Sequence, residues 1–443
     1  MSLCHLPPWL SSVFARFAHC LDRRTAARVP TLLMGILFAS GRRTVTSWLR
    51  AADVTAEYRP AYHAVHAIGR RSERLAATAW HTVKPCLAGS RRLLVAIDDT
   101  PTQRYGPCVQ GAGLHHNPTP GPAGAKFLYG HVWVSLAALA HHPTRGHHTP
   151  CPRGSLYVRQ KNLPKVPPEY NWPFRTKLEM AAAQLRWLKL WAEGHFDELV
   201  AAVDGAYAKQ PFLKPAKAAG FEVISRLRKD AALWSVPSAV RRPGQRGPLP
   251  TYGKDRISLA KRAGQTRGWE TVECVQYGAK VTKTYKTFLA TYRPAGGLIR
   301  VVLVKETDGW LPLFSTNPEA TVVQVLEGAA DRGAHEETFK DVKEVWGAGE
   351  QQVRDVYANV GAFNLCCWMY SAVEAWAWDK PDAEIVDRSK SPWDDPTRRA
   401  SHRDKRKALQ RQVLRQEIDE ALSGQPSKER FRELAERLLA LAA

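Results

Sequence analysis

The sequence predicts a mixed α/β fold whose sheet carries helices on both faces. Between residues 90 and 230, apolar β-branched runs of strand length alternate with helical stretches, and the runs Leu93–Asp98 and Leu199–Gly205 are examples. The stretch Arg175–Glu193 has its apolar residues at the spacing of an amphipathic helix. This alternation is typical of a sheet covered on both sides. From 231 to 314, short β-rich pieces separated by turn signals predict inserted strands.

The N-terminal part of the chain is predicted to be helical. Apolar residues recur at helical spacing in FARFAHCL, VPTLLMGILFA and RTVTSWLRAADV. The segment Gly41–Ala52 is basic and includes Arg42 and Arg43. It suits either a helix-turn-helix-like DNA-binding unit or an ordinary basic helix of a small bundle. We take Arg42 and Arg43 as candidate DNA contacts.

The rest of the chain is divided by the same criteria. Further strands are expected at His131–Ala140, Phe221–Asp230 and Leu311–Asn317, and helices from Pro318 to about Asp379 and at Ser427–Ala443. The predicted division is a helical DNA-binding or dimerisation domain over 1–88, the first part of the α/β domain over 89–230, a β-rich insertion over 231–314, the second part of the α/β domain over 315–380, and a basic helical tail over 381–443. The inserted strands imply either a β subdomain or an extension of the main sheet.

Net charge and cysteine usage limit the partners and the compartment. Lys and Arg number 64 against 42 Asp and Glu, a formal net charge of +22. This excess favours a polyanionic partner, most commonly nucleic acid. A basic tail could account for the same net charge without such a partner. No apolar run approaches the roughly 20 residues that a spanning helix needs. The eight cysteines are scattered, as in a protein with reduced thiols, so we expect a cytoplasmic protein with no membrane partner.

Three acidic residues set far apart are the candidate catalytic groups. Asp98 and Asp204 each follow an apolar run, and Glu336 lies on a predicted helix beside basic residues. Most aspartates after strands are caps or turn residues, so one of them alone carries little information. We prefer Asp98 to Asp99 because Asp98 follows the run directly. Two strand carboxylates and one helix carboxylate can hold a pair of Mg²⁺ ions for phosphodiester cleavage.

The predicted helix around Glu336 carries cations on the same face. Arg332, Glu336 and Lys343 are spaced by four and seven residues, so at 100° per residue they fall within roughly 40° of one another. A metal-phosphate site would use the carboxylate as ligand and the two cations for phosphate oxygens. A solvated stripe of salt bridges has the same pattern. Glu337 faces about 100° away and is the poorer ligand.

These motifs resemble those of the DDE transposases of bacterial insertion sequences, which have an RNase H-like catalytic domain. The chain is most similar to the group with a β-strand insertion between the second Asp and the Glu and a Y-x2-R-x3-E-x6-K helix. IDDT and VDGAY match the two Asp motifs, and Arg332-x3-Glu336-x6-Lys343 matches the helix. The separation of 336 − 204 = 132 residues leaves room for the insertion. GAGLHHNPTPGP, KFLYGHVWV and DVKEVWGAGEQQVRDVYANVGAFNLCCW are also similar, and the resemblance covers roughly residues 90–378.

The resemblance implies a DNA transposase. Its substrates would be the double-stranded transposon ends and the target DNA. The ends would be cut by hydrolysis, which exposes 3′-OH groups, and these groups would then be joined to the target by transesterification. Asp98, Asp204 and Glu336 would be the catalytic residues and the ligands of two Mg²⁺ ions, with Mn²⁺ as an alternative. Arg332 and Lys343 would position the strand. The resemblance further implies a homodimer in the DNA complex and a place on the nucleoid. GPAGAK lacks the P-loop pattern, so we expect no nucleotide cofactor.

The chain departs from the signature at two positions. Ala329 stands where the signature has Tyr, and Gly333 stands where an aromatic residue is usual. The acidic triad is intact, so activity is still expected. The departure affects the contact that the Tyr would make with the phosphate of the transposon end.

Other readings of the sequence remain open. A domesticated transposase, catalytically inactive and acting as a DNA-binding protein, is the main alternative, and a structure-specific nuclease without strand transfer is the second. His148-x2-Cys151 has zinc-like spacing, but no CxxC pair is present, and a flexible polar loop or histidines that contact DNA are the preferred interpretations. Three tryptophans of the insertion either stack on a flipped base or pack in the protein: Trp234, Trp269 and Trp310.

Overall fold

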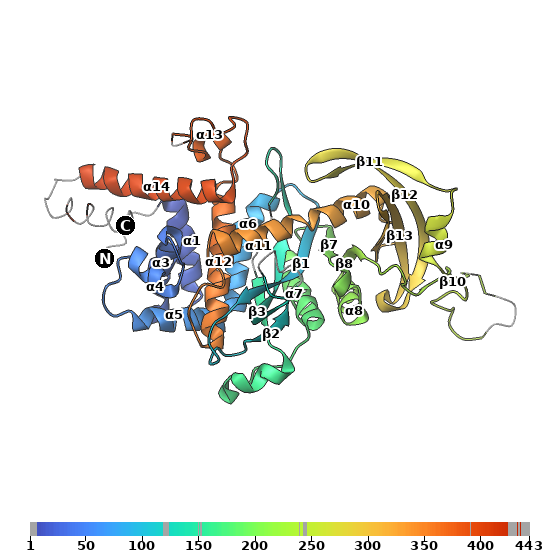
Figure 1. Cartoon of the computed structure of the whole chain (residues 1–443), viewed down its shortest axis with the longest axis horizontal. Coiled ribbons are helices and arrows are strands. Elements are labelled where there is room, and N and C mark those ends of the chain that lie inside the picture. The colour runs from blue at the N-terminus through green and yellow to red at the C-terminus, as the bar shows by residue number, and fades with distance from the viewer. Residues whose placement is uncertain are drawn as a thin grey trace.

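The fold places a cluster of helices at one end of the molecule and a long sheet that runs to the other end (Figure 1). The computed structural model describes residues 7–117, 124–148, 150, 153–238, 240–241, 246–389, 391–423, 432 and 435, without the side chains of residues 147 and 148. Among these residues, no helix combines the length and the hydropathy that crossing a bilayer requires.

Three parallel strands form the centre of the sheet. β1 (Arg92–Gln103) pairs with β7 (Glu198–Val203), and β7 pairs with β8 (Phe221–Arg226). The neighbours on the β1 side are β3 (Phe127–Ala138), β2 (Gly113–His116) and β6 (Arg153–Tyr157). Beyond β8 follow β14 (Gly309–Ser315), β13 (Gly297–Glu306), β12 (Ala279–Tyr292), β11 (Glu270–Gln276), β9 (Leu233–Trp234) and β10 (Arg256–Ile257). The described part of this mixed sheet has 12 strands.

Helices cover both faces of the central strands, as the sequence predicts. Successive strand residues point to opposite faces. Val223 of β8 therefore belongs to the core cluster that includes α7 (Lys177–Ala192) and α8 (Gln210–Ala218), and its neighbour Ile224 belongs to the cluster that includes α10 (Val322–Asp331). Parallel strands buried on both faces need apolar residues at nearly every position, which explains the continuous apolar runs. The fold is a mixed α/β, RNase H-like fold.

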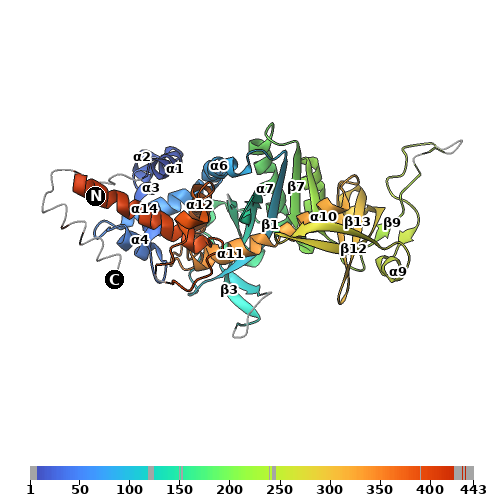
Figure 2. The same cartoon turned by 90° about the horizontal axis from the view of Figure 1, so that it is seen from above.

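The inserted strands extend the main sheet rather than forming a separate one. β14 pairs antiparallel with β8, with Leu313 opposite Arg226, so the edge that β8 would otherwise expose is continued outward. A small helix, α9 (Leu259–Gly264), lies within the insertion. The β11–β12 hairpin reaches back over α10 (Figures 1 and 2), where the backbone N–H of Val275 donates to Oε1 of Glu327 at 2.9 Å.

One long apolar helix joins the N-terminal helices to the sheet. α12 (Val356–Trp376) is buried along most of its length. Its Gly361 packs against Gly69 of α5, where a Cβ on either glycine would collide with the facing backbone. On the sheet side, the ring of Phe363 stacks on Trp133 with centroids 4.0 Å apart. The helices around α12 are α1 (Pro8–His19), α2 (Arg23–Ala26), α3 (Val29–Phe38), α4 (Val45–Ala51), α5 (Arg59–Arg70) and α6 (Ser72–Val83).

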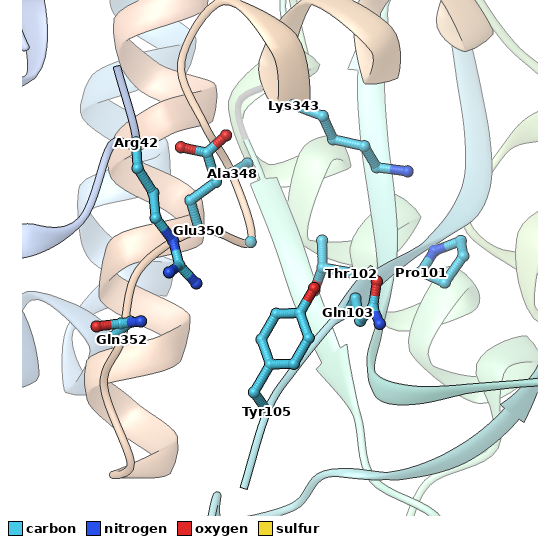
Figure 3. A pocket seen from close by; sticks show the side chains of 10 residues that line it. Arg42, Pro101, Thr102, Gln103, Tyr105, Lys343, Ala348, Glu350 and Gln352 are labelled. Carbon is cyan, nitrogen blue, oxygen red and sulfur yellow. The ribbon is translucent and has the colours of Figure 1, made fainter. Parts of the chain in front are cut away.

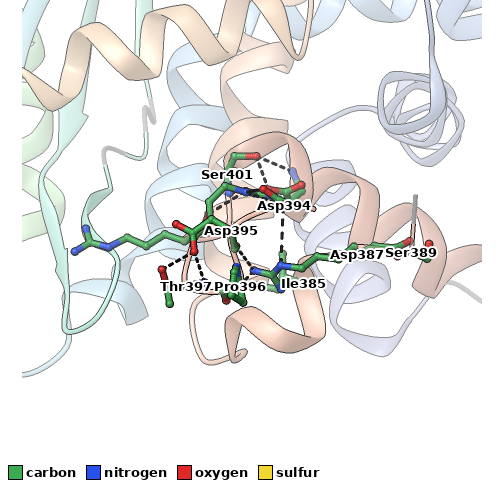
Figure 4. A network of polar contacts seen from close by, with 12 residues as sticks. Ile385, Asp387, Ser389, Asp394, Asp395, Pro396, Thr397 and Ser401 are labelled. Atoms are coloured by element: carbon green, nitrogen blue, oxygen red, sulfur yellow. Dashed lines mark hydrogen bonds and ion pairs between the residues drawn. The ribbon is translucent and has the colours of Figure 1, made fainter. Parts of the chain in front are cut away.

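The basic C-terminal stretch uses several of its cations within the fold. α13 (Asp382–Ile385) and α14 (His402–Ser423) are joined by a polar network, in which Arg398 pairs with Asp394 at 2.8 Å and Asp404 at 2.7 Å (Figure 4). The buried guanidinium of Arg406 donates to carbonyl oxygens at the ends of α3 and of the helix that carries Glu336. The predicted helix Ser427–Ala443 lies outside the described residues, apart from residues 432 and 435.

Candidate active site

Asp98 and Asp204 are brought side by side by the register of β1 and β7. These strands are parallel, and their last paired positions are Ile97 and Val203, each followed by one of the two aspartates. Parallel strands lie roughly 4.8 Å apart, so the two carboxyl groups leave neighbouring backbones at the same level. Only Asp204 ends its strand. The expectation that Asp98 ends one is wrong, because β1 continues to Gln103 by pairing with β3.

The neighbouring Asp99 lies on the opposite face of β1 and has its own partners. Nζ of Lys177, at the start of α7, lies 2.5 Å from Oδ2 of Asp99, and the hydroxyl of Tyr207 donates to Oδ1 at 3.2 Å. Tyr207 belongs to VDGAY, so this bond ties the segment after Asp204 to β1. Burial raises the pKa of Tyr207 well above its ordinary value, with the charge of Asp99 acting in the same direction. The structure therefore assigns Asp99 to holding the two Asp motifs together.

Glu336 is placed near Asp98 by Arg332. Nη1 of Arg332 lies 2.7 Å from Oδ2 of Asp98, and Nη2 lies 3.2 Å from Oε1 of Glu336. Glu336 is itself the most open of the three, with 65% of its side chain exposed. One guanidinium therefore connects the strand acid with the helix acid.

The predicted single helix is in fact two helices. α10 ends at Asp331, and α11 spans Ala334–Glu344. The backbone N–H of Glu336 donates to the carbonyl of Gly333. This bond spans three residues instead of the four of an α-helix, so the chain makes a tighter turn between the two helices. The poor helix propensity of Gly333 favours the break. The backbone stays in the helical region there, so Arg332 still reaches Glu336 four residues on.

The carboxylates form an electrostatically strained group. Burial raises the pKa of Asp98 to about 6. The guanidinium of Arg332 acts against this rise, and the charges of Asp99 and Asp204 add to it. Repulsion among neighbouring carboxylates is relieved by a cation, and a divalent cation prefers hard oxygen ligands of this kind. The donor chemistry fits a divalent metal. Among the described residues, however, no group of three or more acidic, His or Cys side chains is already gathered as a metal site.

Of the other predicted DNA contacts, Lys343 and Arg42 line a groove next to this site, and Arg43 lies beside it. Lys343, near the C-terminal end of α11, and Arg42, between α3 and α4, border the same cavity of about 670 Å³ (Figure 3). Burial lowers the pKa of Lys343 to about 8. Arg43 lies against the loop that follows α11, where its backbone N–H donates to Oε2 of Glu350 at 2.5 Å. The structure thus brings residues from the N-terminal helices to the side of the catalytic domain.

An aromatic residue that the sequence analysis did not single out lies at the departure from the signature. Tyr277, at the tip of the β11–β12 hairpin, is 79% exposed and has a φ of +53°. A Cβ on Gly333 would come within 3.2 Å of its ring. Tyr277, Ala329 and Arg332 border one cavity of about 320 Å³ that also reaches Asp204. A hairpin whose tip residue lies 329 − 277 = 52 residues earlier in the chain therefore supplies a ring beside the gap at Ala329. Chain order contains no signal for this contact.

The three tryptophans of the insertion pack on basic side chains. A cation lies over each indole: Arg293 over Trp234, Lys286 over Trp269 and Lys229 over Trp310. The indoles of Trp269 and Trp310 pack, partly buried, against the main core, and Trp234 is half-buried. Of the zinc-like pair, Cys151 and the side chain of His148 lie outside the described residues.

The fold is RNase H-like, with two aspartates side by side at the centre of its sheet. The model of the DDE superfamily endonuclease family matches residues 16–288, well over half of the 443 residues, and the chain belongs to this family. The match includes Asp98 and Asp204 and ends before Glu336. No curated protein matches the chain. Membership of an endonuclease family makes DNA the substrate and a nuclease or transposase the class of activity.

Proposed function

We propose that the protein is a DDE transposase that binds the terminal inverted repeats of an insertion sequence, cleaves the DNA ends and joins the 3′-OH ends to target DNA. The observation that carries the proposal is the adjacency of Asp98 and Asp204 in register, with Glu336 linked to Asp98 through Arg332. The family membership supports the cleavage part of this function.

The residues of the site suit phosphodiester chemistry. Asp98, Asp204 and Glu336 would hold Mg²⁺, with Mn²⁺ as an alternative, and the bound ions would stabilise charge on the attacking and leaving oxygens. Asp98, with its pKa of about 6, is mainly ionised at neutral pH and so can act as a ligand. The planar fork of Arg332 can turn from the carboxylates to phosphate oxygens, which it binds in the same bidentate way.

The cations outside the triad are proposed to position DNA. Lys343 lies two helical turns beyond Glu336 on α11, so it would contact a phosphate about 10 Å from the reacting one. Arg42 and Arg43 extend the basic surface onto the N-terminal helices. Both ends of an element must be held together for joining, so we propose a homodimer in the DNA complex.

A cleavage and joining assay tests the proposal. The purified protein is incubated with Mg²⁺, with linear DNA that carries the terminal repeats and with a target plasmid. Asp98→Asn, Asp204→Asn and Glu336→Gln should each reduce cleavage at least about 100-fold, because even outer-shell partners of a metal are worth 10–100-fold. Glu337→Gln is the matched control. Its exposed carboxylate lies about 100° around the helix from that of Glu336, so this variant should retain cleavage.

The other outcomes distinguish the alternatives. Binding of the repeats without cleavage would support a catalytically inactive, domesticated transposase acting as a DNA-binding protein. Cleavage without joining to the plasmid would support a structure-specific nuclease. Full cleavage by the Asp98→Asn, Asp204→Asn and Glu336→Gln variants would overturn the assignment of the triad.

A further inference from the structure

Two adjoining cavities form a groove between the N-terminal helices and the end of β1. Their volumes are about 670 and 340 Å³, and both are bordered by Arg42, Gln103 and Tyr105 (Figure 3). One wall comes from the loop before α4, one from β1 and the segment after it, and one from the loop that follows α11. We call this the Tyr105 groove. Segments more than 200 residues apart in the chain therefore build one continuous surface.

The charge of the Tyr105 groove is positive. Arg42, Lys343 and Arg354 contribute cations to its lining. The lining also includes Glu350, but its carboxylate accepts the backbone N–H of Arg43 at 2.5 Å. Among the described residues, the ammonium group of Lys343 has no hydrogen-bond or ion-pair partner, and burial lowers its pKa to about 8. A partly buried ammonium group without a protein partner is suited to an anionic ligand.

An exposed aromatic ring lies among these cations. Tyr105 is 69% exposed and points its hydroxyl and ring into the space between Arg42 and Gln103 (Figure 3). Within the described part of the chain it makes no ring contact that would explain its position. A cationic groove with an open aromatic ring is the combination by which proteins hold single-stranded nucleic acid: phosphates contact the cations and a base stacks on the ring.

The groove lies within reach of DNA held at the triad. Gln103 is five residues beyond Asp98 on β1, which is about 16 Å at the rise of a strand. Lys343 is seven residues beyond Glu336, which is about 10 Å at the rise of a helix. With about 3.4 Å per nucleotide step along a strand, these lengths correspond to roughly three to five nucleotides.

We propose that the Tyr105 groove binds a single-stranded segment of DNA three to five nucleotides from the reacting phosphate, with one base stacked on Tyr105. In a duplex, both faces of a base are stacked on neighbouring bases, so a base can stack on Tyr105 only when it is unstacked. The groove therefore selects single-stranded over double-stranded DNA. The proposal rests on the proposed function for its substrate, and it adds the state of the strand and the residues that hold it.

The test is a binding measurement that needs no cleavage. Fluorescence anisotropy in EDTA gives the affinity of the full chain for a labelled single-stranded oligonucleotide and for the matching duplex. Tyr105→Ala should weaken single-strand binding about tenfold, since base stacking on an aromatic ring is worth about 1–3 kcal/mol. Tyr105→Phe should restore it. Trp393→Ala, which removes an aromatic residue that is 82% exposed elsewhere, is the control.

A second arm measures the phosphate contacts. Replacing Arg42, Lys343 and Arg354 together by Gln should lower the salt dependence of single-strand affinity by about 2 in log–log slope, at about 0.7 per phosphate contact. An oligonucleotide with 2-aminopurine should lose fluorescence on binding the wild type and not the Tyr105→Ala variant. The groove proposal would be overturned if Tyr105→Ala lowered the affinity for duplex and for single-stranded DNA equally. It would also be overturned if Tyr105→Ala left the affinity for single-stranded DNA unchanged.

The two proposals fail in different ways. A protein that binds single strands through Tyr105 but never cleaves DNA would contradict the transposase and leave the groove intact. A protein that cleaves and joins DNA while Tyr105→Ala binds single strands normally would contradict the groove alone.

Discussion

Nη1 of Arg332 lies 2.7 Å from Oδ2 of Asp98, and the other arm of the same guanidinium lies 3.2 Å from Oε1 of Glu336. A cation of the protein thus occupies the carboxylate oxygens that we propose as metal ligands. The arrangement neutralises the acids while no metal is bound, and a metal ion must compete with Arg332 for them.

Arg332→Gln should therefore bind Mn²⁺ more tightly in the absence of DNA, by about three- to tenfold, because one positive charge near the ligands is removed. Titration calorimetry measures this affinity directly. Arg332→Lys keeps the charge but cannot bridge two carboxylates, so its Mn²⁺ affinity should lie between those of the wild type and Arg332→Gln. Weaker binding in Arg332→Gln than in the wild type would contradict this competition.

The hydroxyl of Tyr207 should contribute to stability through Asp99. Tyr207→Phe removes a buried hydrogen bond to a charged group and should lower the free energy of unfolding by about 1.5–3 kcal/mol in urea titrations. Tyr292→Phe is the matched control, because its hydroxyl donates to the neutral carbonyl of Ala208 and should cost about 1 kcal/mol. Similar losses in both variants would show that the charge of Asp99 adds nothing.

The gap at Ala329 should accept a larger side chain. Ala329 borders the cavity of about 320 Å³ beside Tyr277, so Ala329→Tyr should change the free energy of unfolding by less than about 1.5 kcal/mol. Val325, one turn earlier on α10, is fully buried, and Val325→Tyr should cost about 3 kcal/mol through overpacking. Denaturant titration of both variants checks this difference, and equal costs would mean that the cavity cannot hold the ring.

Lys343 should make DNA binding depend on pH above neutrality. Burial lowers its pKa to about 8, so its charge is present below pH 8 and is lost above it. DNA affinity should fall by about threefold between pH 7 and 9, since a neutral amine no longer attracts phosphate. Lys343→Met should remove this fall. By linkage, the folded state binds fewer protons than the unfolded state between pH 8 and about 10.4, so this group favours folding as the pH rises through that window. An unchanged pH profile in Lys343→Met would exclude Lys343 as the cause.

Arg406 should connect the C-terminal helix to the rest of the fold. It donates to the carbonyl oxygens of Leu37, Ala39 and Val345. Arg406→Met removes this donor from Ala39 and Val345, while Leu37 keeps the bond from Gln410. The free energy of unfolding should fall by at least about 3 kcal/mol. Arg403→Met, on the exposed side of the same helix, should change it by less than about 0.5 kcal/mol. Thermal and urea unfolding give both values, and a small loss for Arg406→Met would show that water replaces the guanidinium.

Local pattern alone was enough to predict the mixed α/β fold, because buried parallel strands and amphipathic helices impose different spacings on apolar residues. The choice of Asp98 over Asp99 rested on its place directly after the apolar run and stays a prediction, and the structure adds that the two side chains lie on opposite faces of β1. The expected single helix through Arg332 was wrong, because a single glycine at position 333 is compatible with either an intact helix or a tight turn. The sequence did not predict that Tyr277 lies beside Gly333, or that Tyr105 lies in a groove with Arg42. Both depend on which distant segments pack together.

Short motifs with characteristic spacing were enough to predict the class of the protein, and the same motifs contain the residues that we propose for its chemistry. The arrangement of these residues depends on the tertiary structure. The register of β1 and β7 brings Asp98 beside Asp204, Arg332 links Asp98 to Glu336, and the insertion hairpin brings Tyr277 to Gly333. Contacts of this kind arise from backbone pairing and packing between segments far apart in the chain, and chain order does not encode them locally.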